Sequence, residues 1–195
     1  MNRNRLPIQP QEGLCIEELE IKAQDGWPIR VRTYRRNELN NVPLFIYIHG
    51  GGFVTGGLET DDRYCRMIAA EVDAAVLSIE YRLAPEHPFP AGFDDCLDVM
   101  RWAALTSSQA QLQVNLSKGF VLGGTSAGAN FTAGIAHIVR DEHLTPPLTA
   151  LVFLAGSFCH PDVRPKKYRD RILSVDEIDD APGLTRKSID YFAGR

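Results

Sequence analysis

The stretch Phe120-Val121-Leu122-Gly123-Gly124-Thr125-Ser126-Ala127-Gly128-Ala129-Asn130 decides how the rest of the chain is interpreted. An apolar run ends in two glycines and an amphipathic pattern follows at once, which predicts a strand, a sharp turn and a helix. Gly124 and Gly128 lie two residues on either side of Ser126, where a tight turn leaves no room for side chains. Such a turn lifts a serine hydroxyl out of a sheet, next to the free amides of the following helix. Ser126 is therefore a candidate nucleophile, although a Gly/Ser turn before a helix is also an ordinary structural feature.

A second glycine motif, His49-Gly50-Gly51-Gly52, follows the apolar run Leu44–Ile48, which is typical of a strand buried on both faces. Three glycines without Cβ atoms allow backbone N–H groups to approach a ligand oxygen. We expect Gly51 and Gly52, together with Ala127, to form an oxyanion hole, in which one donor contributes about 2.7–4 kcal/mol. A phosphate-binding loop is the alternative, but neither motif has the G-x-G-x-x-G spacing or the lysine of a P-loop.

The order of the remaining segments predicts an α/β fold with one domain over residues 1–195 and a flexible segment at 1–12. The Gln24-Asp25-Gly26 turn between two alternating segments indicates an antiparallel hairpin. Apolar strands alternating with helices then predict a mostly parallel sheet with helices on both faces. Both glycine motifs fall at carboxyl ends of strands, where functional loops lie. We expect strands at 16–23, 29–35, 44–48, 74–80 and 148–155, a rigid loop at 81–90, helices after residues 60, 90 and 126, and a last helix near 184–192.

Composition narrows the class of partner. The chain has 195 residues, 44% hydrophobic and 24% charged, with a net charge of −4, which argues against a nucleic-acid or anionic-membrane surface. No apolar run approaches a membrane span and no signal sequence is evident, so we expect a cytoplasmic protein. The cysteines are scattered without a C-x-x-C pair, so we expect neither a zinc site nor a disulfide framework. The expected partner is a small, neutral molecule.

Three motifs in this order and spacing resemble the hormone-sensitive-lipase-like branch of the α/β-hydrolases. Thr125 before the serine matches the subgroup that reads GTSAG, and the resemblance extends from about residue 13 to residue 195. The motifs are His49-Gly50-Gly51-Gly52-Phe53, Tyr81-Arg82-Leu83-Ala84-Pro85-Glu86-His87-Pro88-Phe89-Pro90-Ala91 and Gly124-Thr125-Ser126-Ala127-Gly128.

The resemblance implies a carboxylesterase in which Ser126 forms an acyl-enzyme with a small acylated metabolite, without a metal or cofactor. It implies oxyanion-hole donors at Gly51, Gly52 and Ala127. It implies supporting rather than catalytic roles for His49, Gly50, Gly124 and Gly128. Arg82 and Asp95 are expected to pin the proline-rich loop to the following helix.

The family's triad continues with an aspartate and a histidine on loops after two further strands. After Ala155 this sequence offers only the short segment Ile172–Val175 as a comparable strand, so we expect a chain truncated before that aspartate and histidine. His160, with Asp162 two residues further on, is one candidate replacement base, but a solvated loop histidine is commoner.

Three alternatives therefore stay open for the chain. It is an ester hydrolase, or a ligand-binding protein comparable to the plant gibberellin receptors of the same lineage, or an inactive remnant. The apolar strand at 148–155 is also expected to lie at a sheet edge, which favours self-association.

Overall fold

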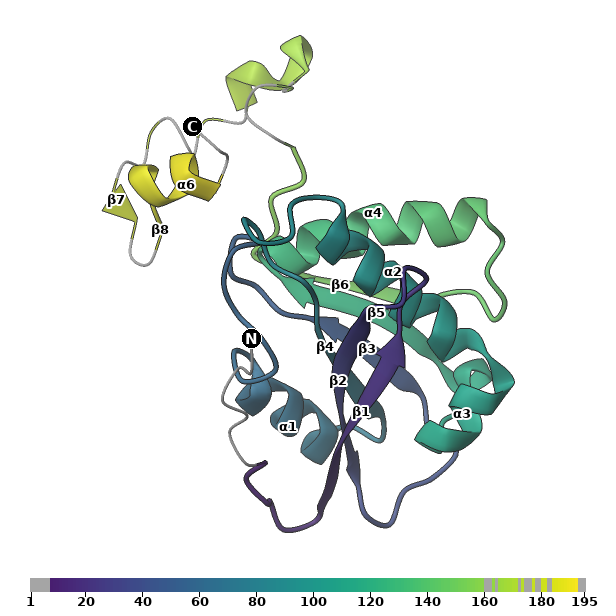
Figure 1. Cartoon of the computed structure of the whole chain (residues 1–195). Helices are drawn as coiled ribbons and strands as arrows, with labels where there is room; N and C mark the ends of the chain where they lie inside the picture. The colour runs from purple at the N-terminus through teal and green to yellow at the C-terminus, as the bar shows by residue number, and fades with distance from the viewer. Residues whose placement is uncertain are drawn as a thin grey trace.

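A six-stranded sheet organises the chain, as seen in a computed structural model that describes residues 8–159, 163, 165–171, 173, 177, 180–181 and 184–192 (Figure 1). The strand order is β1-β2-β4-β3-β5-β6. The strands are β1 (Leu14–Lys22), β2 (Pro28–Arg36), β3 (Leu44–Ile48), β4 (Ala75–Glu80), β5 (Phe120–Thr125) and β6 (Ala150–Leu154).

Strand directions confirm the expected mixture. β1 and β2 form the predicted antiparallel hairpin, and β2 also pairs antiparallel with β4. β4, β3, β5 and β6 are parallel, which is the arrangement predicted from the alternation of strands and helices. Because β3 and β5 are direct neighbours, their carboxyl ends meet at one edge of the sheet, and each of these ends leads into one glycine motif.

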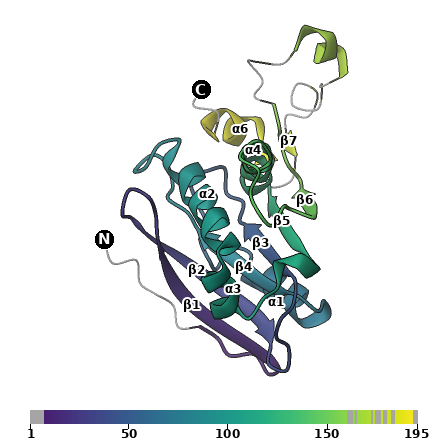
Figure 2. The same ribbon diagram turned by 90° about the vertical axis from the view of Figure 1, so that its right-hand side faces the viewer.

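Helices cover both faces of the sheet (Figure 2). The α1 helix packs on one face, while α2, α3 and α4 pack on the other. Both faces of β3 are buried, which explains why the whole strand is apolar. Leu44, Ile46 and Ile48 join the core under α2 and α4, whereas Phe45 and Tyr47 face α1. The helices are α1 (Asp62–Glu71), α2 (Ala91–Ala104), α3 (Thr106–Leu112), α4 (Ala127–Asp141) and the C-terminal α6 (Arg186–Phe192).

Short elements connect or follow these main ones. A 3₁₀ turn, Leu116–Lys118, precedes β5, and another, Lys166–Arg171, follows β6. A small hairpin of β7 (Asp180–Ala181) and β8 (Leu184–Thr185) leads into α6. None of the described helices is long and apolar enough to cross a membrane.

Some local details differ from the sequence expectations. The polar segment before β5 contains α3, which has no clear apolar stripe but buries Ser108 and Leu112. Asp61 lies at the N-cap of α1, yet its side chain makes no cap hydrogen bond there. The predicted strand candidate Ile172–Val175 falls largely outside the described residues.

Candidate active site

Ser126 lies in a sharp turn between β5 and α4, as its flanking sequence predicts. Its backbone angles are φ 53° and ψ −112°, a region that costs a non-glycine residue about 1–3 kcal/mol. Two hydrogen bonds hold the turn: Ser126 N–H donates to Leu154 O at 2.8 Å, and Asn130 N–H donates to Ser126 O at 3.1 Å. The half-buried side chain does not cap α4. Its hydroxyl is therefore not used to hold the helix end.

Gly124 and Gly128 allow the turn to pack against the end of β3. A methyl group on Gly128 would lie 2.6 Å from the carbonyl carbon of Ile48 and 2.7 Å from His49 O. A methyl group on Gly124 would lie 2.6 Å from the carbonyl carbon of Gly128. Real Cβ atoms do not approach backbone this closely, so both positions need glycine for steric reasons, as the sequence spacing predicts.

The second glycine motif lies directly beside this turn. A methyl group on Gly50 would lie 3.4 Å from Ser126 Cβ and 3.1 Å from Thr125 O. Gly51 and Gly52 have φ angles of 123° and 61°, which favour glycine. Within the described part of the chain, the amides of Gly51 and Gly52 donate no hydrogen bond. Two unused N–H groups therefore lie one and two residues beyond the contact with Ser126.

Ala127, the third candidate donor, is the first residue of α4 and is only 4% exposed. The first N–H groups of a helix have no partner within the helix, and the helix dipole makes this end attractive to negative charge. The structure thus brings the predicted residues of both motifs to one place.

His49 is buried beneath the glycine turn. Its ring stacks on Tyr81 with centroids 4.3 Å apart, and the Tyr81 hydroxyl donates to His49 O at 3.1 Å. Nδ1–H donates to Gly50 O at 2.6 Å. Gly56 leaves the space that the ring fills, since a methyl group there would lie 2.5 Å from Nδ1. These contacts fit a supporting role for this histidine.

The proline-rich loop is fixed by the ion pair that the sequence predicts. Arg82 donates through Nη2 to Asp95 Oδ1 at 2.7 Å, and its backbone N–H donates to Asp95 Oδ2 at 2.8 Å. The Asp95 side chain is fully buried at the start of α2. The hydrogen bonds that Arg82 donates to Asp95 are the main cause of its raised pKa, and they outweigh the opposing effect of burial. The prediction that this pair pins the loop to the helix is confirmed.

The C-terminal helix covers part of the glycine turn. A methyl group on Gly52 would lie 2.6 Å from ring atoms of Phe192 in α6. Two cavities, of about 570 and 610 Å³, lie elsewhere, the first beside Cys15 and Leu112 and the second beside Asp94. Neither is lined by a residue of the two glycine motifs.

One polar contact at the site has no clear signal in the sequence. The Tyr47 hydroxyl lies 2.6 Å from Thr125 Oγ1, although Tyr47 stands in an apolar strand and reads as an ordinary core residue. Burial is the main cause that raises the pKa of Tyr47, so its hydroxyl stays protonated. This contact joins the ends of β3 and β5.

The histidines provide no described partner for Ser126. His87 packs edge-on against Trp27 at 4.9 Å, and His137 and His143 are exposed on and after α4. Among the residues that the structure covers, no histidine is hydrogen-bonded to Ser126. His160 and Asp162, the candidate replacement pair, lie outside the described residues.

These features define an α/β-hydrolase, with a mostly parallel sheet, a strained serine turn before a helix and a glycine-rich turn beside it. A family model described as alpha/beta hydrolase fold matches residues 45–194, and the chain belongs to this family. The resemblance seen in the sequence is confirmed at this level.

Several similar proteins are named as esterases, and one similar structure is that of a cyclase. The chain is 38% identical to carboxylesterase NlhH of Mycobacterium tuberculosis over 96% of this chain and 56% of that protein. It is 30% identical to versiconal hemiacetal acetate esterase of Aspergillus parasiticus over 94% of this chain and 54% of that protein. The crystal structure of vibralactone cyclase superimposes with a TM-score of 0.88 and 33% identity, over 95% of this chain and 55% of that one. The chain thus spans about half the length of the relatives it matches.

Proposed function

We propose that this chain carries the nucleophile and the oxyanion hole of a carboxylic ester hydrolase. The observation that carries the proposal is the meeting of Ser126 with the glycine turn: a methyl group on Gly50 would contact Ser126 Cβ at 3.4 Å. The strained φ of 53° at Ser126 adds support, because such strain clusters at functional sites. The esterase relatives support ester hydrolysis as the reaction class.

In the proposed reaction, Ser126 Oγ bonds to the ester carbonyl carbon while its proton passes to a general base. Negative charge develops on the carbonyl oxygen, where the amides of Gly51, Gly52 and Ala127 would donate hydrogen bonds. The bond to the alcohol then breaks, the alcohol takes up the proton, and water hydrolyses acyl-Ser126. No step requires a metal or cofactor. The proposed substrate is a small acylated metabolite with a short or medium acyl chain.

The proton acceptor decides how fast this reaction runs. In the covered part of the chain no imidazole is hydrogen-bonded to Ser126. From these residues alone we expect the rate enhancement that an oxyanion hole and binding supply, about 10³–10⁴ over water.

A fluorophosphonate probe tests the proposal, because it reacts with an activated serine and forms a stable adduct. We expect labelling at Ser126, detected by mass spectrometry of the digested chain, and its loss in Ser126→Ala. Ser157→Ala is a matched control, since Ser157 is exposed near the same turn, where its carbonyl accepts from Asn130 Nδ2 at 2.7 Å. Labelling that persists in Ser126→Ala would contradict the proposal. Thermal stabilisation by an ester ligand without any labelling would favour the receptor-like alternative.

We also propose that a second copy of this chain pairs along β6, within the strand expected at 148–155. β6 pairs with β5 on one side, and no described strand lies on its other side. Its side chains carry no charge, and Leu151 and Phe153 are 40% and 42% exposed. An uncharged, apolar edge strand offers unpaired backbone groups to another strand, and an identical edge supplies an equally apolar one.

A further inference from the structure

The hydrogen bond between Tyr47 and Thr125 joins the two strands that lead into the glycine motifs. Tyr47 lies two residues before His49, and Thr125 lies immediately before Ser126. The backbone ladder between β3 and β5 ends with the pair Ile48 and Gly124. Tyr47 itself pairs with Gly123 in this ladder, and its hydroxyl reaches Thr125 Oγ1, one residue beyond Gly124, at 2.6 Å.

Side-chain packing at the end of β5 is otherwise sparse. Gly123 and Gly124 present no side chains, and the space over Gly123 is filled by Phe45, whose ring would lie 2.8 Å from a methyl group there. Thr125 therefore provides the last side chain of the strand that can fix its position. Tyr47 is 1% exposed and packs between Phe45 and Tyr64, with ring centroids 5.9 and 5.4 Å away. The anchor for Thr125 is thus rigid.

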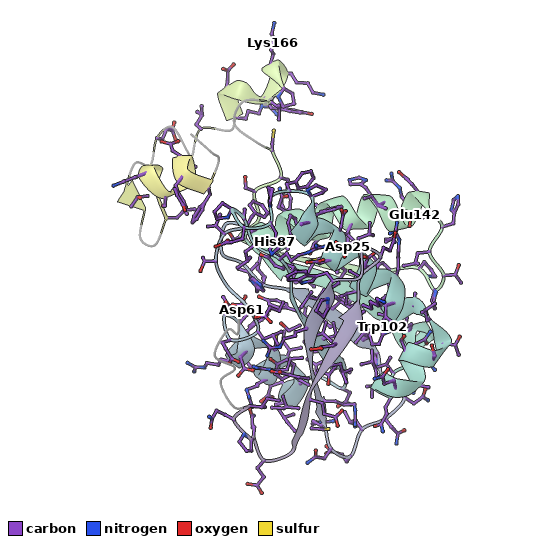
Figure 3. All side chains as sticks on the ribbon, in the orientation of Figure 1. Asp25, Asp61, His87, Trp102, Glu142 and Lys166 are labelled. Carbon is purple, nitrogen blue, oxygen red and sulfur yellow. The ribbon has the colours of Figure 1, made fainter. Side chains whose placement is uncertain are left out.

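The start of α1 is attached to the same face of the sheet on which Tyr47 lies. Asp62 accepts hydrogen bonds from Arg32 at 2.9 Å and from Tyr34 at 2.8 Å. Arg32 is 1% exposed, so this attachment of α1 to the sheet is buried. Asp61 lies at the adjacent N-cap position (Figure 3). Burial is the largest cause of the raised pKa of Tyr47, and the charge of the Asp61 carboxylate raises it further.

We propose that Tyr47 is a positioning residue that sets, through Thr125, where Ser126 lies relative to the Gly50–Gly52 turn. The proposal rests on the proposed function for its effect on reactivity. Thr125 fixes the end of β5, and Tyr47 fixes Thr125 to β3. The glycine turn starts from the same strand, β3, so the bond defines the spacing between nucleophile and oxyanion donors.

The rate of fluorophosphonate labelling of Ser126 tests this role. Misplacement by about 1 Å can cost about 100-fold in rate, so we expect Tyr47→Phe and Thr125→Val to lower the maximal labelling rate by about 10- to 100-fold. The probe concentration giving half-maximal rate should change little, because the probe still binds. Thr125→Ser retains the hydroxyl and should restore a near wild-type rate.

Tyr34→Phe is the matched control, because it removes a buried tyrosine hydroxyl on the same face of the sheet. That hydroxyl bonds Asp62 at 2.8 Å and not Thr125, so its loss should leave the labelling rate near that of the wild type. Equal rates in the Tyr47→Phe, Tyr34→Phe and wild-type chains would overturn the proposal. An equal loss in both tyrosine variants would also overturn it, since it would indicate a general structural effect.

Amide hydrogen exchange tests the positioning role of Tyr47 independently of whether Ser126 reacts. In Tyr47→Phe we expect faster exchange in the peptide covering residues 121–131 than in Tyr34→Phe, whether or not Ser126 reacts. If the wild-type chain does not label, the proposed function fails, and the exchange difference alone decides the positioning role. The same exchange in both variants would overturn it.

Discussion

Replacing Gly128 with alanine should separate the α4 helix from the end of β3. The added methyl group would lie 2.6 Å from the carbonyl carbon of Ile48 and closer still to its oxygen. Gly134→Ala is the matched control in the same helix, because its methyl group would meet Phe93 Cε2 at 2.8 Å, on a side chain rather than backbone. A ring can turn away, but a strand carbonyl cannot move without breaking the sheet.

The expected cost follows from these distances. Carbon atoms in contact prefer about 3.5 Å, so the helix must move away from β3 by most of an ångström in Gly128→Ala. Overpacking of this kind costs about 1–3 kcal/mol and sometimes more, and we expect about 3 kcal/mol because both clashing groups are backbone. Gly134→Ala gains up to about 1 kcal/mol of helix propensity, which offsets the movement of Phe93. The two variants should therefore differ by at least about 2 kcal/mol.

Urea denaturation measures this difference, with the fluorescence of Trp27 and Trp102 as the signal. For a chain of this size, about 2 kcal/mol corresponds to a difference in Tm of about 4–8 °C. Labelling of Ser126 should also fall in Gly128→Ala, since the first turn of α4 moves with the helix. Equal free energies of unfolding in the Gly128→Ala and Gly134→Ala variants would refute the close approach of α4 to β3.

Other expectations concern charge and the sheet edge. Asp95→Asn should lower the free energy of unfolding by about 3 kcal/mol in urea denaturation, because Arg82 loses its buried carboxylate. Burial raises the pKa of Glu18, but hydrogen bonds from two arginines outweigh it, so the pKa lies below the ordinary value of 4.5. The stability that it supplies is complete above that value and is lost as pH falls through the folded-state pKa; Glu18→Gln should reduce this dependence of the urea midpoint. Leu151→Lys should reduce the mass seen by light scattering at high concentration, and an unchanged mass would contradict pairing along β6.

The order of strands and helices could be predicted because each element has a local signal. Apolar runs bounded by Pro, Gly and Asp gave β3 and β4 to within one residue, and the Asp25-Gly26 turn gave the hairpin. The α3 helix has no such signal, because its polar Ser/Gln sequence carries no apolar stripe, and only Ser108 and Leu112 are buried in it. The neighbours of each strand in the sheet also depend on contacts distant in the chain.

The parts of the site where backbone sterics require glycine could be predicted from the sequence. Contacts between side chains distant in the sequence could not. Gly124 and Gly128 follow from the space that a turn allows, so their spacing identifies Ser126. Arg32 shows the limit: it stands in the charged segment Arg30–Arg36 and reads as solvent-exposed, yet it is 1% exposed. Its carboxylate partners come from β1, from the loop before α1 and from the first residue of α1. Only the folded sheet brings these together.

The strain at Ser126 connects the fold to the proposed chemistry. A positive φ at a serine is unfavourable, and glycine at this position would form the same turn without that cost. The turn is nevertheless held by backbone hydrogen bonds to Leu154 and Asn130 and by the packing of Gly128 against β3. Such packing can tolerate an unfavourable residue, but it gives no reason for one to be there. The proposed role for the hydroxyl, beside the amides of Gly51 and Gly52, would supply that reason, and it is the role that the spacing of the two motifs predicts.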